Sequence, residues 1–456
     1  MRPRQRSNLH YRVYLSLVII IQIIINLKGL LPGSVFLIFS QPPSFRKSGL
    51  SKIYYGSLRV LLKTWFLTYR VVEVEACVSP LSALFQDLAG HTPKIIFPLE
   101  VKGGSNPPPC RTKYSSRRCR CIASYCFLIY NKFMDNLSTK EKILDSLKPI
   151  IKNSSVVSIN KEKIFELAEK IKEYPIPNWD NITQFLGEPE ETIQYYFFLD
   201  SINFCFWNIR GKERWTFEKD GEWLNGYSAF SYAIKKAVLK NKKLLDASYL
   251  SNITFEEFSK IFEGKGELLL LEKRHEIIRE NFKILRDKYA ENAANLVRIA
   301  ENNVNKLIES ILKDFPSFKD WSEFQDQKIY FLKRAQIFIS DIYYAFQGKH
   351  YGFFKNMEDL TIFADYKLPQ LLEAEGVLVY DETLKNKIKN DVLIEKDSLE
   401  EIEIRTNTIF ACEMLVQQLS KLGRKLTSQN IDWMLWFLAK NTKFFLPYHK
   451  TITTNY

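Results

Sequence analysis

"RHEIIRENFKILRDKYAENAANLVRIAENNVNKLIESILKDF" (residues 274–315) is the stretch that decides the fold class. Its apolar residues recur every three or four positions, the spacing that gathers them on one face of an α-helix. Ser138, followed by Glu141, has the pattern of a capping box at the start of a further helix. The same helical spacing runs through residues 138–153, 160–174, 231–241, 254–262 and 401–422. The sequence therefore predicts a mainly α fold.

One β-hairpin is expected to interrupt the helices. In "ERWTFEKDGEW" (213–223), Trp215 and Phe217 alternate with polar residues, and Asp220-Gly221 supplies a two-residue turn. The aromatic run "YYFFLDSINFCFW" (195–207) is expected in the core. Because residues 134–456 contain no long linker, repeat or low-complexity tract, we expect a single compact helical domain there.

Residues 1–133 differ in composition from the rest and show little regular patterning, whereas helical periodicity begins near Met134. The apolar run 13–27 contains Gln22 and Asn26, and its 15 residues fall short of a membrane span, which needs roughly 20. We interpret residues 1–133 as an extension that function does not require, or as a stretch wrongly joined to the gene. A genuine targeting or anchoring segment stays open as the alternative, and only then is a membrane contact expected.

The formal net charge of +13 is unevenly distributed. Residues 1–133 hold 19 Lys and Arg against 4 Asp and Glu, whereas residues 134–456 hold 46 basic and 48 acidic residues, a net of −2. A protein that binds a nucleic-acid backbone needs a positively charged surface that attracts the phosphates. We therefore expect no direct nucleic-acid binding by residues 134–456.

Cysteine usage indicates the compartment. Five of the seven cysteines precede residue 134, which leaves Cys205 and Cys412 in the remainder. Two isolated cysteines do not form a disulfide framework, so we expect a cytoplasmic protein. The nucleus is a further candidate compartment, and an N-terminal anchor is not expected. The cluster "CRTKYSSRRCRCIASYC" (110–126) does not have the spacing of a standard zinc site.

Several cofactor motifs are missing from residues 134–456. "GKGELL" (264–269) lacks the later glycine and the preceding strand of a dinucleotide-binding loop, and no Walker-type loop is present. "HEIIRE" (275–280) lacks the second His of a zinc-protease helix, and the histidines at 275, 350 and 449 do not cluster. We expect neither a metal nor a cofactor.

A carboxylate stands out in "QNIDWMLWFLAKN" (429–441). On a helical period Asp432 shares a face with Leu435, Trp436 and Ala439. Burying an unpaired carboxylate among such residues is costly. Two interpretations stay open: Asp432 is a functional group, or it caps the helix whose start is indicated by residues 428–430.

A second candidate lies in "LTIFADYKLPQLL" (360–372). Phe363 precedes Asp365 by two residues, so a ring is placed near a carboxylate. Such a pair suits a planar, nitrogen-rich ligand, because the ring stacks on it while the carboxylate accepts two hydrogen bonds from an amidine-like edge. The alternative is a loop cap beside an ordinary core phenylalanine.

A third candidate is "FLKRAQIFISDIYYAF" (331–346). Lys333 and Arg334 begin this predicted helix, and Asp341 follows further along. A basic pair at this place either clamps a phosphate or forms part of a solvated face.

Eight blocks resemble, in order and approximate spacing, the queuosine salvage family of queuosine 5′-phosphate N-glycosylases. They are "FLDSINFCFW", "NGYSAFSYAI", "LEKRHEII", "FLKRAQIFISD", "TIFADYKLPQ", "IEIRTNT", "IDWMLW" and "PYHKT". The resemblance covers about residues 134–456. It implies a mainly helical fold similar to helix-hairpin-helix DNA glycosylases, and a hydrolase that frees queuine from queuosine 5′-monophosphate for reuse in tRNA.

The resemblance also implies roles for five residues. Asp432 falls on the family's catalytic aspartate, which acts as nucleophile or as stabiliser of the transition state. Phe363 and Asp365 fall on the residues that bind the base, and Trp433 falls on an aromatic neighbour of the catalytic aspartate. Lys333 lies in a matching block, and we assign it to the 5′-phosphate.

Elementary chemistry is consistent with these roles. Breaking an N-glycosidic bond builds positive charge on the ribose, so a fixed carboxylate in a site of low polarity lowers the barrier. Queuine is a 7-deazapurine and lacks the ring nitrogen at which purines are usually protonated as they leave. The site must therefore bind the base by another edge, where Asp365 can accept the N1–H and the 2-amino group.

Two positions depart from the family pattern. The family often has an acidic residue five positions after the catalytic aspartate, where this chain has Phe437. It also has a ligand-contacting histidine near the start of the fold, and in "IPNWDNITQFLG" the nearest counterparts are Thr183 and Gln184. These departures concern the residues that would contact the cyclopentenediol group of the ligand.

Two other functions remain as alternatives. The departures at Phe437 and at the missing histidine would permit a non-catalytic binder of queuine or of a modified nucleotide. A nucleic-acid glycosylase is suggested only by analogy of fold, and the net charge of −2 argues against it.

Overall fold

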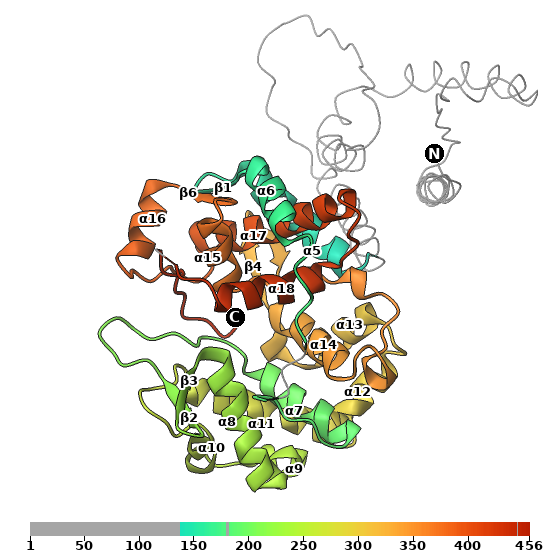
Figure 1. The fold of residues 1–456 in the computed structure, drawn as a ribbon. Helices are drawn as coiled ribbons and strands as arrows, with labels where there is room; N and C mark the ends of the chain where they lie inside the picture. The colour runs from blue at the N-terminus through green and yellow to red at the C-terminus, as the bar shows by residue number, and fades with distance from the viewer. Residues whose placement is uncertain (1–136, 179–181, 445) are drawn as a thin grey trace, which may run out of the picture. The chain divides into compact units, whose positions relative to one another are not determined.

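Fourteen α-helices and three short strand pairs make up the residues that this computed structural model describes, 137–178, 182–444 and 446–456 (Figure 1). The prediction of a mainly α fold is therefore confirmed, whereas the similarity to helix-hairpin-helix DNA glycosylases stays a prediction. The helices are α5 (Thr139–Asn153), α6 (Lys161–Ile171), α7 (Pro189–Ser201), α8 (Gly226–Lys240), α9 (Ala247–Leu250), α10 (Phe255–Ile261), α11 (Leu271–Lys288), α12 (Ala293–Ile299), α13 (Val304–Asp314), α14 (Lys333–Ala345), α15 (Lys367–Ala374), α16 (Glu382–Lys389), α17 (Leu399–Lys421) and α18 (Ser428–Lys440).

All three strand pairs are antiparallel. They are β1 (Val157–Ile159) with β6 (Leu378–Tyr380), β2 (Thr216–Lys219) with β3 (Glu222–Asn225), and β4 (Trp321–Phe324) with β5 (Gln327–Tyr330). The β2–β3 pair is the predicted hairpin, turning at Asp220-Gly221, both with positive φ. The β4–β5 hairpin was not predicted because its turn, Gln325-Asp326, adopts positive φ without a glycine. The β1–β6 pair joins segments far apart in the sequence, which local patterns do not reveal.

The stretch 274–315 divides into α11, α12 and α13. Ala290 and Glu291 end the first helix, and Glu301 and Asn302 separate the other two, all four with positive φ. A left-handed backbone cannot continue a right-handed helix, so the chain changes direction at each break. The predicted capping box at Ser138 and Glu141 is present at the start of α5.

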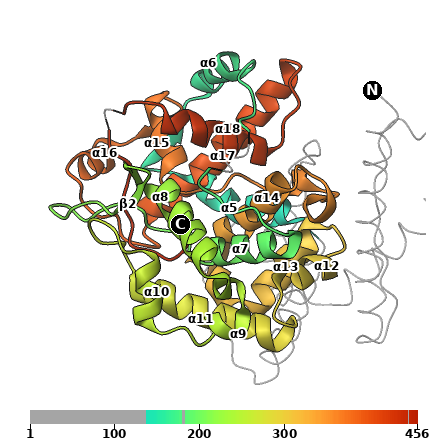
Figure 2. The same cartoon turned by 60° about the horizontal axis from the view of Figure 1, so that its bottom comes forward.

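The helices gather into two groups with α14 near the middle. In Figure 1, α7 to α11 lie in the lower part, whereas α5, α6 and α15 to α18 lie in the upper part; Figure 2 gives a second view. Helix α14 packs on α7, and α17 packs on α5, α6 and α18. Buried apolar side chains, from Ile143 to Tyr456, form one continuous cluster.

The predicted aromatic core is confirmed. Side chains 195–198 are fully buried on α7. The ring of Phe197 packs against Phe282 of α11, Phe315 and Phe338 of α14, with ring centroids 5.0 to 5.7 Å apart. These contacts fix the position of α14, which carries several residues of the site described below.

Residues 1–133 and the boundary at 134 lie outside the described residues, so the interpretation of that segment stays a prediction. Among the residues that are described, no helix has both the length and the apolar character needed to cross a membrane.

Candidate active site

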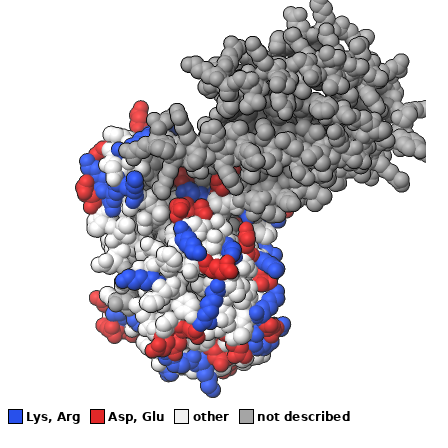
Figure 3. Space-filling view, turned by 90° about the vertical axis from the view of Figure 1, so that its right-hand side faces the viewer, with Lys and Arg blue, Asp and Glu red and all other residues white. Residues whose placement is uncertain are grey.

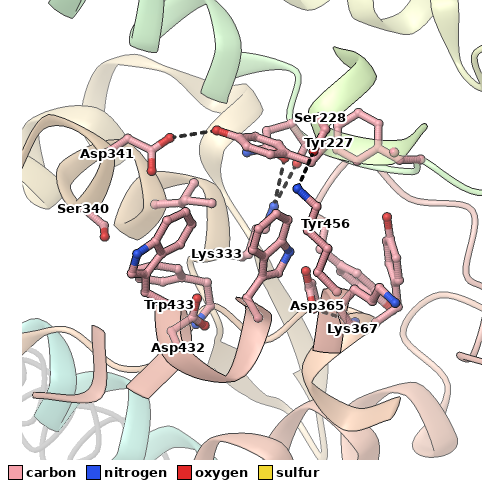
Figure 4. Close-up of a pocket in the computed structure, with 18 of the residues that line it drawn as sticks. Tyr227, Ser228, Lys333, Ser340, Asp341, Asp365, Lys367, Asp432, Trp433 and Tyr456 are labelled. Carbon is pink, nitrogen blue, oxygen red and sulfur yellow. Dashed lines mark hydrogen bonds between the residues drawn. The ribbon is translucent and has the colours of Figure 1, made fainter. Parts of the chain in front are cut away.

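A cavity of about 150 Å³ opens where the two groups of helices meet (Figure 4). Its walls come from the start of α8, one face of α14, residues 363–367, one face of α18 and Tyr456. The charged side chains that line it are Arg214, Lys333, Asp341, Asp365, Lys367, Asp432 and Lys440. All five residues predicted for the site, which are Phe363, Asp365, Trp433, Asp432 and Lys333, line this cavity.

Asp432 lies in the second turn of α18 and does not cap it. The N-cap is Thr427, whose side chain accepts the N–H of Asn430, while Asn430 in turn accepts the N–H of Thr427. The capping interpretation of Asp432 is therefore wrong. The Asp432 side chain is 7 % exposed, and its Oδ1 accepts a hydrogen bond of 2.8 Å from the backbone N–H of Phe363.

Burial dominates the electrostatics of Asp432. Loss of solvent raises the pKa of its carboxyl well above the ordinary 3.8, and the nearby Asp365 raises it further. The hydrogen bond from Phe363 and the charge of Lys333 act in the opposite direction and favour the ionised form. Asp432 is thus a carboxyl that water does not stabilise and that gains from a positive charge placed in the cavity.

Asp365 has a structural role as well as a place in the cavity. Its Oδ1 accepts the N–H groups of Lys367 and Leu368, at 2.7 and 3.3 Å, at the start of α15. The loop-cap interpretation is therefore correct for this oxygen. Phe363, 5 % exposed, lines the same cavity. Burial raises the pKa of Asp365, and Lys333 opposes that rise.

Lys333 and Arg334, the basic pair at the start of α14, have different surroundings. The Lys333 side chain is 4 % exposed, and its Nζ donates to the backbone oxygen and to Oδ1 of Asn203, at 3.0 and 3.3 Å. Arg334 is fully buried on another side, where it donates to the carbonyl oxygens of Ser201 and Ser317. Neither residue belongs to a solvated face, and only Lys333 lines the cavity.

The charge of Lys333 is held among carboxyl groups. Burial lowers the pKa of its ammonium, while Asp365, then Asp200, and more weakly Asp432, raise it. Figure 4 shows the Lys333 side chain between Asp341 on one side and Asp365 on the other. Lys333 is therefore a cation that limits mutual repulsion among the acids of this cavity.

Trp433 forms part of an aromatic wall. Its Nε1 donates to the Pro177 carbonyl oxygen at 2.8 Å, and its ring stacks on Trp436 with centroids 5.5 Å apart and planes 4° apart. Phe437, the first departure from the family pattern, packs against Trp433 and Trp436. It does not line the cavity. Thr183 and Gln184 are buried and are not among the residues that line the cavity.

The cavity lining also includes residues that were not predicted for the site, among them Arg214, Tyr227, Lys440 and Tyr456. Tyr227 belongs to the block "NGYSAFSYAI", so the resemblance to the family could have indicated it as a site residue. The isolated basic residues Arg214 and Lys440 lie in no such block, and no sequence pattern indicates them. Arg214 precedes β2 in a segment that pairs with residues 264–267. A Cβ on Gly264 would lie 2.2 Å from the Thr216 oxygen, so the close approach requires this glycine.

The cavity combines groups suited to chemistry at a developing cation. A buried, oriented carboxylate favours positive charge, and the aromatic walls reduce its contact with water. A planar ligand can lie against a ring while Asp365 accepts hydrogen bonds from its edge. No group of three or more His, Cys, Asp or Glu in the described part of the chain could hold a metal ion.

Comparisons with known proteins identify the family. The profile of the queuosine salvage protein family matches residues 182–456, more than half of the chain. Three relatives are named queuosine 5′-phosphate N-glycosylase/hydrolase. The protein of Sphaerobacter thermophilus is 34 % identical over 69 % of this chain and 97 % of its own length. The protein of Nematostella vectensis is 33 % identical over 67 % of this chain and 96 % of its own length. The protein of Mus musculus is 30 % identical over 67 % of this chain and 96 % of its own length. The chain belongs to the queuosine salvage protein family.

Proposed function

We propose that this protein hydrolyses the N-glycosidic bond of queuosine 5′-monophosphate and releases queuine. The observation that carries the proposal is the buried Asp432, held by the N–H of Phe363 in the cavity that Asp365 also lines. Membership of the family, whose relatives carry the name of this activity, supports it.

Asp432 supplies the catalytic charge. As the bond from C1′ to the base breaks, the ribose gains positive charge, and a carboxylate already oriented by Phe363 stabilises it without reorganisation. Because the carboxylate is poorly solvated, its attraction for the cation is stronger than it would be in water. Water then bonds through its oxygen to C1′, and the proton it loses ends on the nitrogen of the departing base, so that queuine and ribose 5-phosphate are released.

Phe363 and Asp365 bind the departing base. The ring of Phe363 stacks on the planar base, and Trp433 closes the same cavity from α18. Oδ1 of Asp365 is engaged by two backbone N–H groups, which fix the orientation of the carboxylate. Its other oxygen is then directed to the N1–H and 2-amino edge of the base.

Lys333 binds the 5′-phosphate in this proposal. An ammonium has three N–H donors, and two of those of Lys333 reach Asn203. Among the described residues no acceptor takes the third, so it can serve a ligand oxygen. Arg214 and Lys440 add positive charge to the same cavity. A monophosphate is accordingly preferred over the free nucleoside.

The surface favours a small molecule over a nucleic acid as the substrate. Residues 134–456 carry a net charge of −2. On the face drawn in Figure 3, acidic and basic side chains of the described residues alternate. A phosphate backbone binds through a continuous basic region. We accordingly propose a cytoplasmic enzyme that acts on a free nucleotide and makes no direct contact with tRNA.

The decisive experiment incubates the full chain with queuosine 5′-monophosphate and measures free queuine by mass spectrometry. We expect queuine to accumulate catalytically, and Asp432→Asn to reduce turnover by about two to three orders of magnitude, the usual loss when a preorganised electrostatic group is removed. Asp326→Asn, a matched change in the exposed β4–β5 turn, serves as the control. Binding of the nucleotide without queuine release would favour the alternative of a non-catalytic binder.

A further inference from the structure

Asp341 is an acid of the cavity to which the proposed mechanism gives no task. It lies on the face of α14 that also carries Lys333, Ile337 and Ser340, all of which line the cavity. Lys333 and Asp341 are eight residues apart on one helix, a separation of about 12 Å at 1.5 Å per residue. Figure 4 shows Asp341 on the side of the cavity opposite to Asp365, with Asp432 and Lys333 between them.

This position places Asp341 beside the sugar. The base is assigned to Phe363 and Asp365 and the anomeric carbon to Asp432, so a nucleotide that spans these points extends its ribose toward the opposite side. Asp341 and Asp432 line the same cavity, and the charge of Asp432 contributes to the raised pKa of Asp341. The 2′-hydroxyl is the ribose hydroxyl bonded next to that carbon.

The Asp341 carboxyl has unused capacity to accept hydrogen bonds. It is 4 % exposed, and among the described residues a single hydrogen bond reaches it, from the Tyr227 hydroxyl to Oδ2 at a long 3.3 Å. An ionised carboxylate offers about four acceptor positions. Burying such a group with a single weak donor is unfavourable, and a ligand hydroxyl would reduce the cost.

The groups around Asp341 come from four helices. Asp200 of α7 and Asp432 of α18 are acidic neighbours, Lys333 of α14 is the basic one, and Tyr227 of α8 supplies the hydroxyl. Burial raises the pKa of Asp341, and Asp200 raises it further, whereas Tyr227 and Lys333 oppose that rise. A further donor directed at Asp341 would favour its ionised form in the same way.

Tyr227 distinguishes Asp341 from the other two acids of the cavity. Asp432 and Asp365 are oriented by backbone N–H groups, which are fixed donors. The partner of Asp341 is a phenol hydroxyl, which can rotate and can both donate and accept. A substrate hydroxyl can therefore join the pair of Tyr227 and Asp341 without displacing a backbone contact.

We propose that Asp341, oriented by Tyr227, accepts a hydrogen bond from the ribose 2′-hydroxyl of the substrate. This inference rests on the proposed function. Hydrogen bonds to the hydroxyl next to the reacting carbon strengthen as a glycosyl cation forms, so the contact contributes more to the transition state than to substrate binding. Asp341 is then a residue that favours ribonucleotides over 2′-deoxyribonucleotides.

The test compares wild type, Asp341→Asn and Tyr227→Phe on queuosine 5′-monophosphate and on its 2′-deoxy analogue. Single-turnover rates with excess enzyme are measured, so that slow cleavage is still detected. On the ribonucleotide we expect Asp341→Asn to lower the rate about 10- to 100-fold, the range for a hydrogen bond to a charged group, and Tyr227→Phe to lower it less. On the 2′-deoxy analogue both variants should stay within about threefold of wild type, because the contact is absent there.

A structural role for Asp341 would lower both substrates' rates by the same factor, and that result overturns the proposal. An unchanged rate on the ribonucleotide overturns it as well. Thermal unfolding of each variant, with Asp326→Asn as matched control, separates misfolding from loss of the contact. If wild type releases no queuine from queuosine 5′-monophosphate, the proposed function itself fails, which distinguishes the two failures.

Discussion

Arg405 and Asp320 form a bidentate ion pair, and both side chains are almost entirely buried. Nη1 and Nη2 of Arg405 donate to the two carboxylate oxygens of Asp320, at 2.9 and 2.7 Å. Oδ2 of Asp320 also accepts the N–H of Lys333, and Nε of Arg405 donates to the carbonyl oxygen of Ala364. One buried pair thus holds the start of α14 and the segment between Phe363 and Asp365, two walls of the cavity.

Arg405→Met is expected to destabilise the fold strongly. It leaves the Asp320 carboxylate buried without its partner, which costs about 3–5 kcal/mol. The free energy of unfolding from denaturant titration tests this, with Arg279→Met, at an exposed position of α11, as the control. A similar small change in both variants would mean that the buried pair does not hold the cavity walls together.

The rate of queuine release should fall as the pH is lowered, starting well above the ordinary carboxyl range. Asp432 must be ionised to stabilise the sugar cation, and burial raises its pKa well above 3.8. As the pH falls through that raised pKa, the carboxylate is protonated and kcat/KM decreases. The pH profile of kcat/KM checks this, and a rate that stays constant down to pH 3.8 would remove Asp432 from the ionised role.

Asp432→Asn should be more stable than wild type at neutral pH, although its turnover is expected to be much lower. A carboxyl whose pKa is higher in the folded state binds more protons folded than unfolded, so stability falls as the pH rises between the two pKa values. Asparagine retains an oxygen for the Phe363 N–H and carries no charge. We expect a gain on the order of 1 to 3 kcal/mol in the free energy of unfolding, the desolvation cost of such a group. Thermal melts at two pH values should show the larger gain at the higher one.

Asp365→Asn separates capping from recognition of the base. The amide oxygen can still accept the N–H groups of Lys367 and Leu368, so α15 should stay intact. The charge that receives the edge of the base is lost, and kcat/KM should fall about 10- to 100-fold. Asp381→Asn provides the control, since the Asp381 side chain caps α16 by accepting the N–H of Leu384 and lies outside the cavity lining. Equal losses in the two variants would indicate a capping role alone.

Local patterns account for what was correctly predicted. Helical periodicity, the capping box at Ser138 and the Asp220-Gly221 turn depend on neighbours a few residues apart, so each is visible without a fold. The β4–β5 hairpin escaped prediction because Gln325-Asp326 takes a backbone conformation that glycine usually marks. The family was predicted from eight blocks of similar sequence, because blocks in the same order indicate common ancestry and overall composition does not.

What the sequence determined by itself was the mainly helical class, the β2–β3 hairpin and the family. The tertiary structure alone decided that Asp432 meets the N–H of Phe363, that Arg334 turns away from the cavity that Lys333 enters, and that Tyr227 reaches Asp341. Adjacent helical residues point about 100° apart, but which of them faces a cavity depends on the packing of other helices. These contacts join segments distant in the sequence, and long-range packing is the part of folding that local periodicity does not encode.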